Sequence, residues 1–179
     1  MKVVSLEYSQ RELFAGMDPF DSLKNTALPG WFALVSARES GEEDIPCGLL
    51  VAELTQARLF IHWLLVLPEE RQKGAGEALL NEAIRIAAEA GCHLITVLIS
   101  KGSEWNGVCM GADRYLSEMG FEPDKQMNRQ NKSAWAMTTS ADNYRKEKNK
   151  WKELPYSKQL ELLTKEGLLE KEGLFTEEE

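Results

Sequence analysis

The feature that most constrains the fold is a hydrophobic run that leads through a glycine-containing turn straight into an amphipathic helix. Residues 57–67 (ARLFIHWLLVL) would be apolar on both faces of a strand, as is typical in the middle of a sheet. Apolar residues then recur with helical spacing from Gly76 until Gly91, which is well placed to end the helix. A second apolar run, 94–99 (LITVLI), follows, and strand, helix and strand in this order predict one right-handed crossover unit.

The other segments predict strands and a short helix around this crossover. Candidate strands are residues 3–6, 31–37, 46–54 and 133–139, and residues 113–119 predict a helix. Ser40, Gly41 and the acidic residues 42–44 separate two of these strands and predict an antiparallel hairpin with a loop longer than the two-residue type. The expected fold class is therefore mixed α/β.

A change in composition after Ser140 divides the chain. Lysines alternate with polar residues over 146–152, and the sequence KEGL at 165–168 recurs at 171–174. Two such copies are too few for a repeat architecture. We predict a main domain over residues 1–139 and a polar, partly helical C-terminal extension over 140–179.

Composition excludes several classes of function. A net charge of -8 and a pI near 5.0 argue against a nucleic-acid partner, because phosphate backbones bind to basic surfaces. No apolar run reaches the ~18 residues of a membrane span, and the first residues lack the features of a signal peptide, so we expect no membrane partner and a cytoplasmic location. Cys47, Cys92 and Cys109, together with two histidines, form no pattern with the spacing of metal ligands, so we expect neither a metal nor a disulfide framework.

The turn before the helix has the chemistry of a phosphate site. Glycines at positions 74 and 76 would let an anion approach backbone N–H groups without a Cβ in the way, and the first N–H groups of a helix lack partners within the helix. Two better-known phosphate motifs do not fit. Glu77 and Ala78 stand where a P-loop needs Lys and Ser or Thr, and Leu79 stands where a dinucleotide-binding turn needs a small residue.

The segment resembles the GNAT superfamily of acetyl-CoA-dependent N-acetyltransferases, whose signature Arg/Gln-x-x-Gly-x-Gly/Ala is matched by Arg71, Gly74 and Gly76. Residues 112–121 (ADRYLSEMGF) are similar to that family's short helix ending in Gly-Phe. The resemblance implies a mostly antiparallel central sheet in which two splayed parallel strands form the acetyl-CoA cleft, flanked by helices. It also implies that acetyl-CoA is bound by the strand end, the turn and the helix start, at Leu64, Leu65, Val66, Arg71, Gln72, Lys73, Gly74, Ala75, Gly76 and Glu77.

The reaction implied by the resemblance is direct attack of a primary amine on acetyl-CoA in a ternary complex. His62, four residues before Val66, lies where many relatives place a catalytic Glu and is a candidate base; Glu53 is the alternative. Tyr115 is the candidate proton donor, although Leu116 stands at the family's usual tyrosine position.

The acceptor would be a small-molecule or peptide amine, and we take Trp105 as its best candidate contact. Transfer of a longer acyl group, and a catalytically idle CoA-binding module that acts through its charged tail, remain as alternatives. The sequence leaves the oligomeric state open, a homodimer included.

Overall fold

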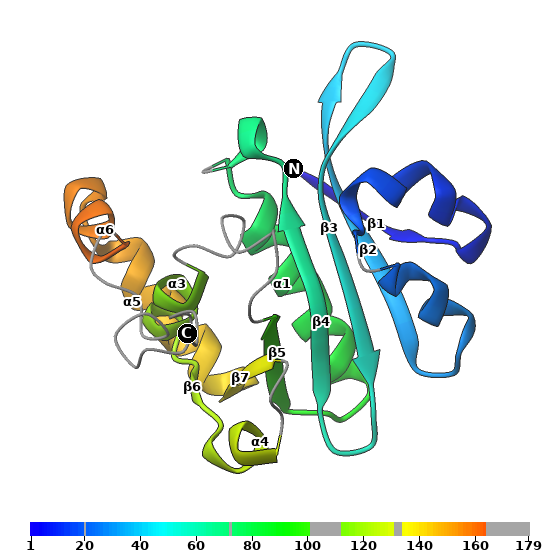
Figure 1. The fold of residues 1–179 in the computed structure, drawn as a ribbon. Coiled ribbons are helices and arrows are strands. Elements are labelled where there is room, and N and C mark those ends of the chain that lie inside the picture. The colour runs from blue at the N-terminus through cyan, green and yellow to red at the C-terminus, as the bar shows by residue number, and fades with distance from the viewer. Residues whose placement is uncertain (20, 72, 101–111, 131–133, 164–179) are drawn as a thin grey trace, which may run out of the picture. The chain divides into compact units, whose positions relative to one another are not determined.

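The computed structural model describes residues 1–19, 21–71, 73–100, 112–130 and 134–163 (Figure 1). Two compact units divide the chain, Met1–Ile95 and Thr96–Glu179. The strands are β1 (Lys2–Leu6), β2 (Trp31–Ser40), β3 (Glu43–Leu54), β4 (Leu59–Val66), β5 (Leu94–Ser100), β6 (Glu122–Pro123) and β7 (Ala134–Ser140). They form one sheet in the order β1-β2-β3-β4-β5-β7-β6, mostly antiparallel with β4 and β5 parallel, which confirms the predicted fold class.

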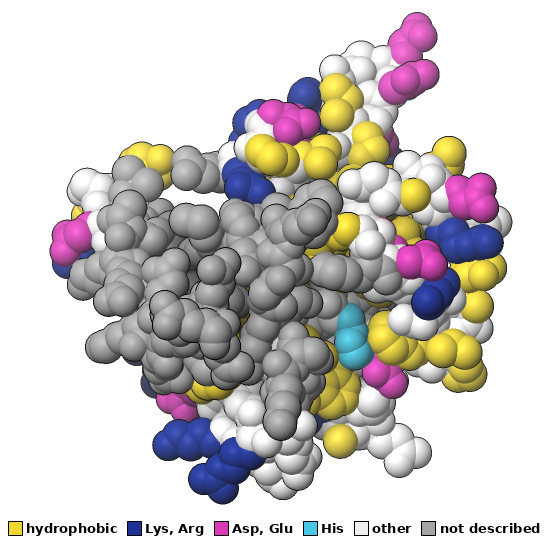
Figure 2. All heavy atoms as spheres, in the orientation of Figure 1, with side chains coloured by type: hydrophobic (Ala, Val, Ile, Leu, Met, Phe, Trp, Pro, Cys, Tyr) yellow, Lys and Arg dark blue, Asp and Glu magenta, His cyan; other side chains and the backbone are white. Residues whose placement is uncertain are grey.

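The first unit contains the four antiparallel strands β1 to β4, three short 3₁₀ helices and one long helix. The helices are η1 (Tyr8–Met17), η2 (Ser22–Ala27), η3 (Pro68–Glu70) and α1 (Ala75–Glu89). Every residue from Cys47 to Ala52 in β3 is buried, because β3 lies between β2 and β4 with both faces covered. In the space-filling view, hydrophobic and charged side chains are mixed over the exposed face of this unit (Figure 2).

The hairpin between β2 and β3 differs from the prediction. Ser40 pairs with Glu43, so the turn contains only Gly41 and Glu42, and the predicted longer loop is wrong. The acidic residues that suggested a loop instead extend β3 where its side chains face solvent, and Asp44 forms an ion pair with Lys2 of β1 at 3.1 Å. Gly41 supplies the positive φ of 64° that a two-residue turn needs at its first position.

Helix α1 packs on β1 to β4 through the predicted apolar stripe (Figure 1). The buried residues of this stripe are Leu79, Leu80, Ala83, Ile84 and Ala87. The helix ends as predicted at Gly91, with φ 79° and backbone bonds from Gly91 to Ala88 and from Cys92 to Ala87. These two bonds form a Schellman motif and satisfy the last carbonyls of the helix.

The second unit contains β6, β7 and four helices among its described residues. The helices are α3 (Ala112–Glu118), α4 (Lys125–Gln130), α5 (Ala141–Glu153) and α6 (Tyr156–Leu163), so the predicted short helix and last strand are confirmed. Ser140 caps α5 by accepting from the Asn143 N–H at 3.1 Å, and Tyr144 of α5 is buried edge-to-face against Phe121. The start of the predicted extension thus packs on its own unit, while the domain boundary at 139/140 stays a prediction.

Candidate cofactor turn and proton-transfer site

Helix α1 begins directly after a turn whose backbone leaves room for a ligand. Its N-cap is Gly74, with φ 88° and ψ 6°, and no described side chain caps the helix. A Cβ added to Gly74 would have no described atom within 4 Å, whereas one added to Gly76 would lie 3.4 Å from Cγ2 of Val66. No described atom thus fills the space beside Gly74, and no described side chain accepts from the first N–H groups of α1, as an anion site requires.

The buried carboxylate of Glu70 bonds charged side chains next to this turn. Glu70 of η3 is only 3% exposed, and both of its oxygens accept from Nε of Arg38 at 3.1 Å. Nζ of Lys73 lies 3.5 Å from the same carboxylate, as does Sγ of Cys47. Burial opposes ionisation of Glu70, but hydrogen bonds and charge from Arg38, with Cys47 and Lys73, outweigh it and hold the pKa of Glu70 below its ordinary value.

Sequence reasoning missed the role of Glu70. The structure places the carboxylate of Glu70 inward, against Arg38 of β2, 32 residues earlier in the chain. Nothing in the sequence pairs Arg38 with this position. The same burial, together with Glu70, raises the pKa of the Cys47 thiol, which favours a neutral core cysteine.

The basic side chains of the turn are exposed and also bond the backbone. Arg71 donates from Nε to the Val66 carbonyl at 3.3 Å, and Lys73 donates from Nζ to the Glu69 carbonyl at 2.9 Å. Gln72 lies outside the described residues. The head groups of both side chains therefore bond backbone carbonyls at the end of β4 and in η3.

The predicted ligand-binding strand end divides its side chains between two faces. Leu64 and Val66 lie on the half-buried face of β4, whereas Leu65 points to the other face and is 2% exposed. Only the backbone of Leu65 is thus available to a ligand. The half-buried face continues from Val66 to the turn, so the structure brings these predicted residues together.

His62 lies on this same face of β4, at a break in the strand pairing. Val51 of β3 pairs with Trp63 and Ala52 with Ile61, so His62 is the extra residue of a β-bulge. Its Nε2 lies 3.2 Å from Oε2 of Glu53, and its ring stacks on Trp31, with centroids 4.4 Å apart. The two alternative bases predicted from the sequence are therefore members of one hydrogen-bonded pair.

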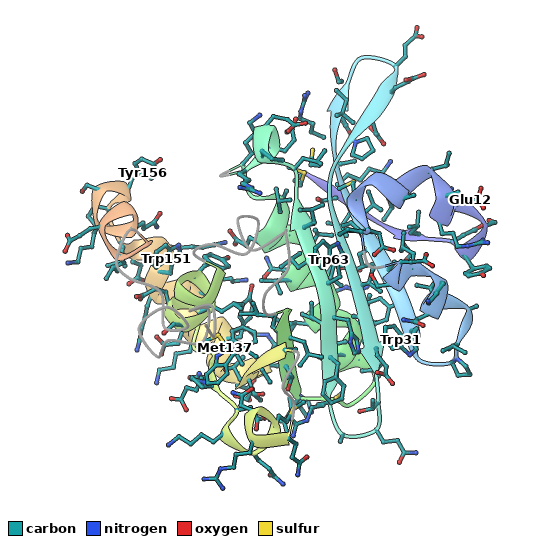
Figure 3. The ribbon with its side chains drawn as sticks, viewed as in Figure 1. Glu12, Trp31, Trp63, Met137, Trp151 and Tyr156 are labelled. Carbon is teal, nitrogen blue, oxygen red and sulfur yellow. The ribbon has the colours of Figure 1, made fainter. Side chains whose placement is uncertain are left out.

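Trp31 is the first residue of β2, and Trp63 belongs to β4 (Figure 3). The alternating burial of β4 puts Trp63 on the opposite face from His62. Trp31 pairs directly with Glu53, which in turn pairs with Phe60, so these residues form one row across three strands. Trp63 is instead a core residue, whose Nε1 donates to the Met17 carbonyl at 2.8 Å. Trp31 therefore accompanies His62, and Trp105, the predicted acceptor contact, falls outside the described residues.

Tyr115 belongs to the second unit, and its ring packs edge-to-face on Trp151 with centroids 6.4 Å apart. Leu116, at the family's usual tyrosine position, is 3% exposed and is a core residue. The role of Tyr115 as a proton donor stays a prediction. Cys109 also lies outside the described residues.

Two further findings concern metals and membranes. Among the described residues, no group of three or more His, Cys, Asp or Glu side chains could hold a metal ion. Within the same part of the chain, no helix is long and apolar enough to cross a membrane.

Comparison with known proteins agrees with this geometry. The model of the acetyltransferase (GNAT) family matches residues 4–106, which is more than half of the chain, whereas no curated protein matches this sequence. Spermidine/spermine N-acetyltransferase SpeG from Vibrio cholerae has a similar structure, with 14% identity, a TM-score of 0.56, and coverage of 82% of this chain and 97% of its own.

An aminoglycoside 6'-N-acetyltransferase solved with coenzyme A is also similar, with 14% identity, a TM-score of 0.52, and coverage of 79% and 97%. A nourseothricin acetyltransferase, 23% identical with a TM-score of 0.48, aligns over 63% of this chain and 66% of its own. The matched family model and the shared fold place the chain in the acetyltransferase (GNAT) family.

Proposed function

We propose that this protein transfers an acetyl group from acetyl-CoA to a primary amine by direct attack in a ternary complex. The observation that carries the proposal is that one face of β4 joins an uncapped, glycine-led helix terminus to a histidine held by a carboxylate. The first feature suits a pyrophosphate, and the second suits removal of a proton.

The cofactor site would use backbone and side chains together. The N–H groups at Ala75, Gly76 and Glu77 would bind the pyrophosphate, with Arg71 and Lys73 beside it. Each charge-assisted hydrogen bond contributes about 1.5–3 kcal/mol, against about 0.3–1 kcal/mol for the dipole of an exposed helix end. Directed N–H bonds would therefore dominate binding. Leu64 and Val66 would contact the pantetheine arm.

In the chemical step, His62 would take a proton from the substrate ammonium group. The free amine would then attack the thioester carbonyl, and the C–S bond would break as the amide forms. Tyr115 is the proposed donor of a proton to the departing thiolate, so Tyr115→Phe should lower kcat without changing the affinity for acetyl-CoA. An unchanged kcat would assign that protonation to solvent or to another group.

The proposal is tested first by calorimetric titration of acetyl-CoA into the wild-type protein, and then by thiol release with a panel of small-molecule and peptide amines. We expect micromolar binding and amine-dependent release that His62→Ala lowers by roughly 100-fold or more, the usual contribution of a general base. Lack of acetyl-CoA binding would refute the acyltransferase proposal. Full activity in His62→Ala would refute the choice of base.

A second candidate is a CoA-binding module without catalysis, and the observation that favours it is the burial of Leu116 where relatives carry a tyrosine. It predicts that acetyl-CoA binds to the wild type while no amine of the panel increases thiol release above the background rate.

A further inference from the structure

The environment of His62 restricts how its ring is oriented. Glu53 approaches one ring nitrogen, Nε2, and Trp31 covers one face of the ring at an interplanar angle of 23°. Phe60 lies on the same row, with its ring centroid 6.2 Å from that of His62. The side chains of His62 and Glu53 are 27% and 32% exposed, so both are reachable from solvent.

The hydrogen bond also distinguishes the two nitrogens of the ring. A carboxylate can only accept, so a neutral imidazole that bonds to Glu53 must carry its proton on Nε2. Nδ1 then keeps the lone pair, and no described residue forms a hydrogen bond with it. One nitrogen is therefore occupied as a donor, while the other is available as an acceptor.

The strand pairing explains why these groups meet. Glu53 of β3 lies opposite Phe60, which is two residues before His62 on the same face of β4. The imidazole therefore lies diagonally beside a carboxylate of the adjacent strand. Because His62 is also the extra residue of the bulge, its backbone has no partner directly opposite on β3.

From this geometry we propose that Glu53 is a positioning residue, which holds His62 in the Nε2–H form so that Nδ1 is the atom that accepts the proton of the acceptor amine. This inference rests on the proposed function. The ammonium group of the substrate gives one proton to Nδ1, and the ring becomes an imidazolium whose Nε2–H still donates to the Glu53 carboxylate. The amine lone pair forms the C–N bond while the C–S bond breaks. The nitrogen loses its second proton to solvent, the thiolate takes up a proton from Tyr115 or solvent, and Nδ1 returns its own proton to solvent.

The test combines kinetics with a spectroscopic signal. Glu53→Gln keeps the size of the side chain but removes its charge and adds an amide donor that can stabilise the wrong ring form. Glu39→Gln is the matched control, because it makes the same charge change at an exposed position of β2. The chain contains only His62 and His93, so ¹⁵N-histidine labelling gives two rings, and His93→Gln identifies the signals of His62.

We expect the neutral ring of His62 to carry its proton on Nε2 in the wild type and in Glu39→Gln, and to be a mixture of the Nε2–H and Nδ1–H forms in Glu53→Gln. We also expect kcat to fall at least tenfold in Glu53→Gln, with the KM for acetyl-CoA unchanged, because Glu53 is not part of the cofactor turn.

A wild-type ring protonated on Nδ1 would overturn the inference, and so would an unchanged kcat in Glu53→Gln. Wild-type protein that transfers no acetyl group would refute the proposed function itself. This result needs no variant. The ¹⁵N signals of His62 would still show whether Glu53 determines which ring nitrogen carries the proton.

Discussion

Replacing Gly74 by alanine should weaken coenzyme A binding far more than it destabilises the fold. The residue has φ 88°, a conformation that an L-residue with a Cβ rarely adopts. The added methyl group meets no described atom within 4 Å, so the substitution carries backbone strain but no clash in the free protein. We expect a loss of about 1–2 kcal/mol in the free energy of unfolding, equivalent to roughly 2–8 °C in Tm for a chain of this size.

The effect on binding follows from the space that the methyl group would fill. That space is where an anion would reach the first N–H groups of α1, and each charge-assisted hydrogen bond lost there costs about 1.5–3 kcal/mol. Loss of one such bond should raise the Kd for coenzyme A roughly 10- to 150-fold. Strain in the free protein cannot produce this change alone, because it affects the bound and the free protein alike.

Two control variants separate strain from obstruction. Gly91→Ala introduces the same kind of strain, at φ 79° and with no described atom within 4 Å, but at the opposite end of α1. Gly76→Ala adds a methyl group in ordinary contact with Val66, at a position where the family signature accepts alanine. Calorimetric titration of coenzyme A should show near wild-type affinity for Gly91→Ala and a smaller loss of affinity for Gly76→Ala than for Gly74→Ala, while chemical denaturation measures stability. Equal affinity of Gly74→Ala and Gly91→Ala would refute an anion site at this turn.

Two further predictions concern stability. Glu70→Gln removes a carboxylate whose pKa is held below its ordinary value of 4.5, so the stability it contributes is present above that value and is lost as the pH falls through the folded-state pKa. Denaturation curves of wild type and variant should differ most near pH 7 and converge in acid; a difference independent of pH would contradict the charge pairing with Arg38. Gly120→Ala combines strain at φ 90° with a Cβ 2.5 Å from Nδ2 of Asn143, which donates to the Gly120 carbonyl. We expect it to lose about 2–4 kcal/mol, clearly more than Gly91→Ala, and equal losses would show that the contact relaxes freely.

The sequence was sufficient to predict those parts of the structure that depend on residues close together in the chain. The turn at Gly74, the apolar stripe of α1 and the Schellman motif at Gly91 are all local, and each was predicted from spacing and glycine positions. The fold class followed from the order of these elements. Local conformation and the burial of one apolar face point to the same structure in this segment, so the prediction needed no knowledge of distant contacts.

The sequence was insufficient where residues far apart meet. The bond between Arg38 and Glu70 spans 32 residues, and no local pattern indicates that the side chain of this glutamate is buried. No residue pattern predicts the hydrogen bond between His62 and Glu53 or the β-bulge at His62. The β2–β3 turn was predicted too long, because acidic side chains are equally compatible with a loop and with an exposed strand end.

The side chains of β4 alternate between two faces of the strand. This alternation determines from which face a bound cofactor could contact the proposed base. His62, Leu64 and Val66 share the half-buried face, and Val66 adjoins Gly76 at the start of α1. At about 3.3 Å per residue, His62 lies roughly 13 Å along the strand from Val66. A ligand anchored at the turn and extended along this face would therefore reach the histidine. On the opposite face the corresponding side chains are those of Trp63 and Leu65, which are 5% and 2% exposed, so we expect a ligand to bind on the face that carries His62 and Glu53.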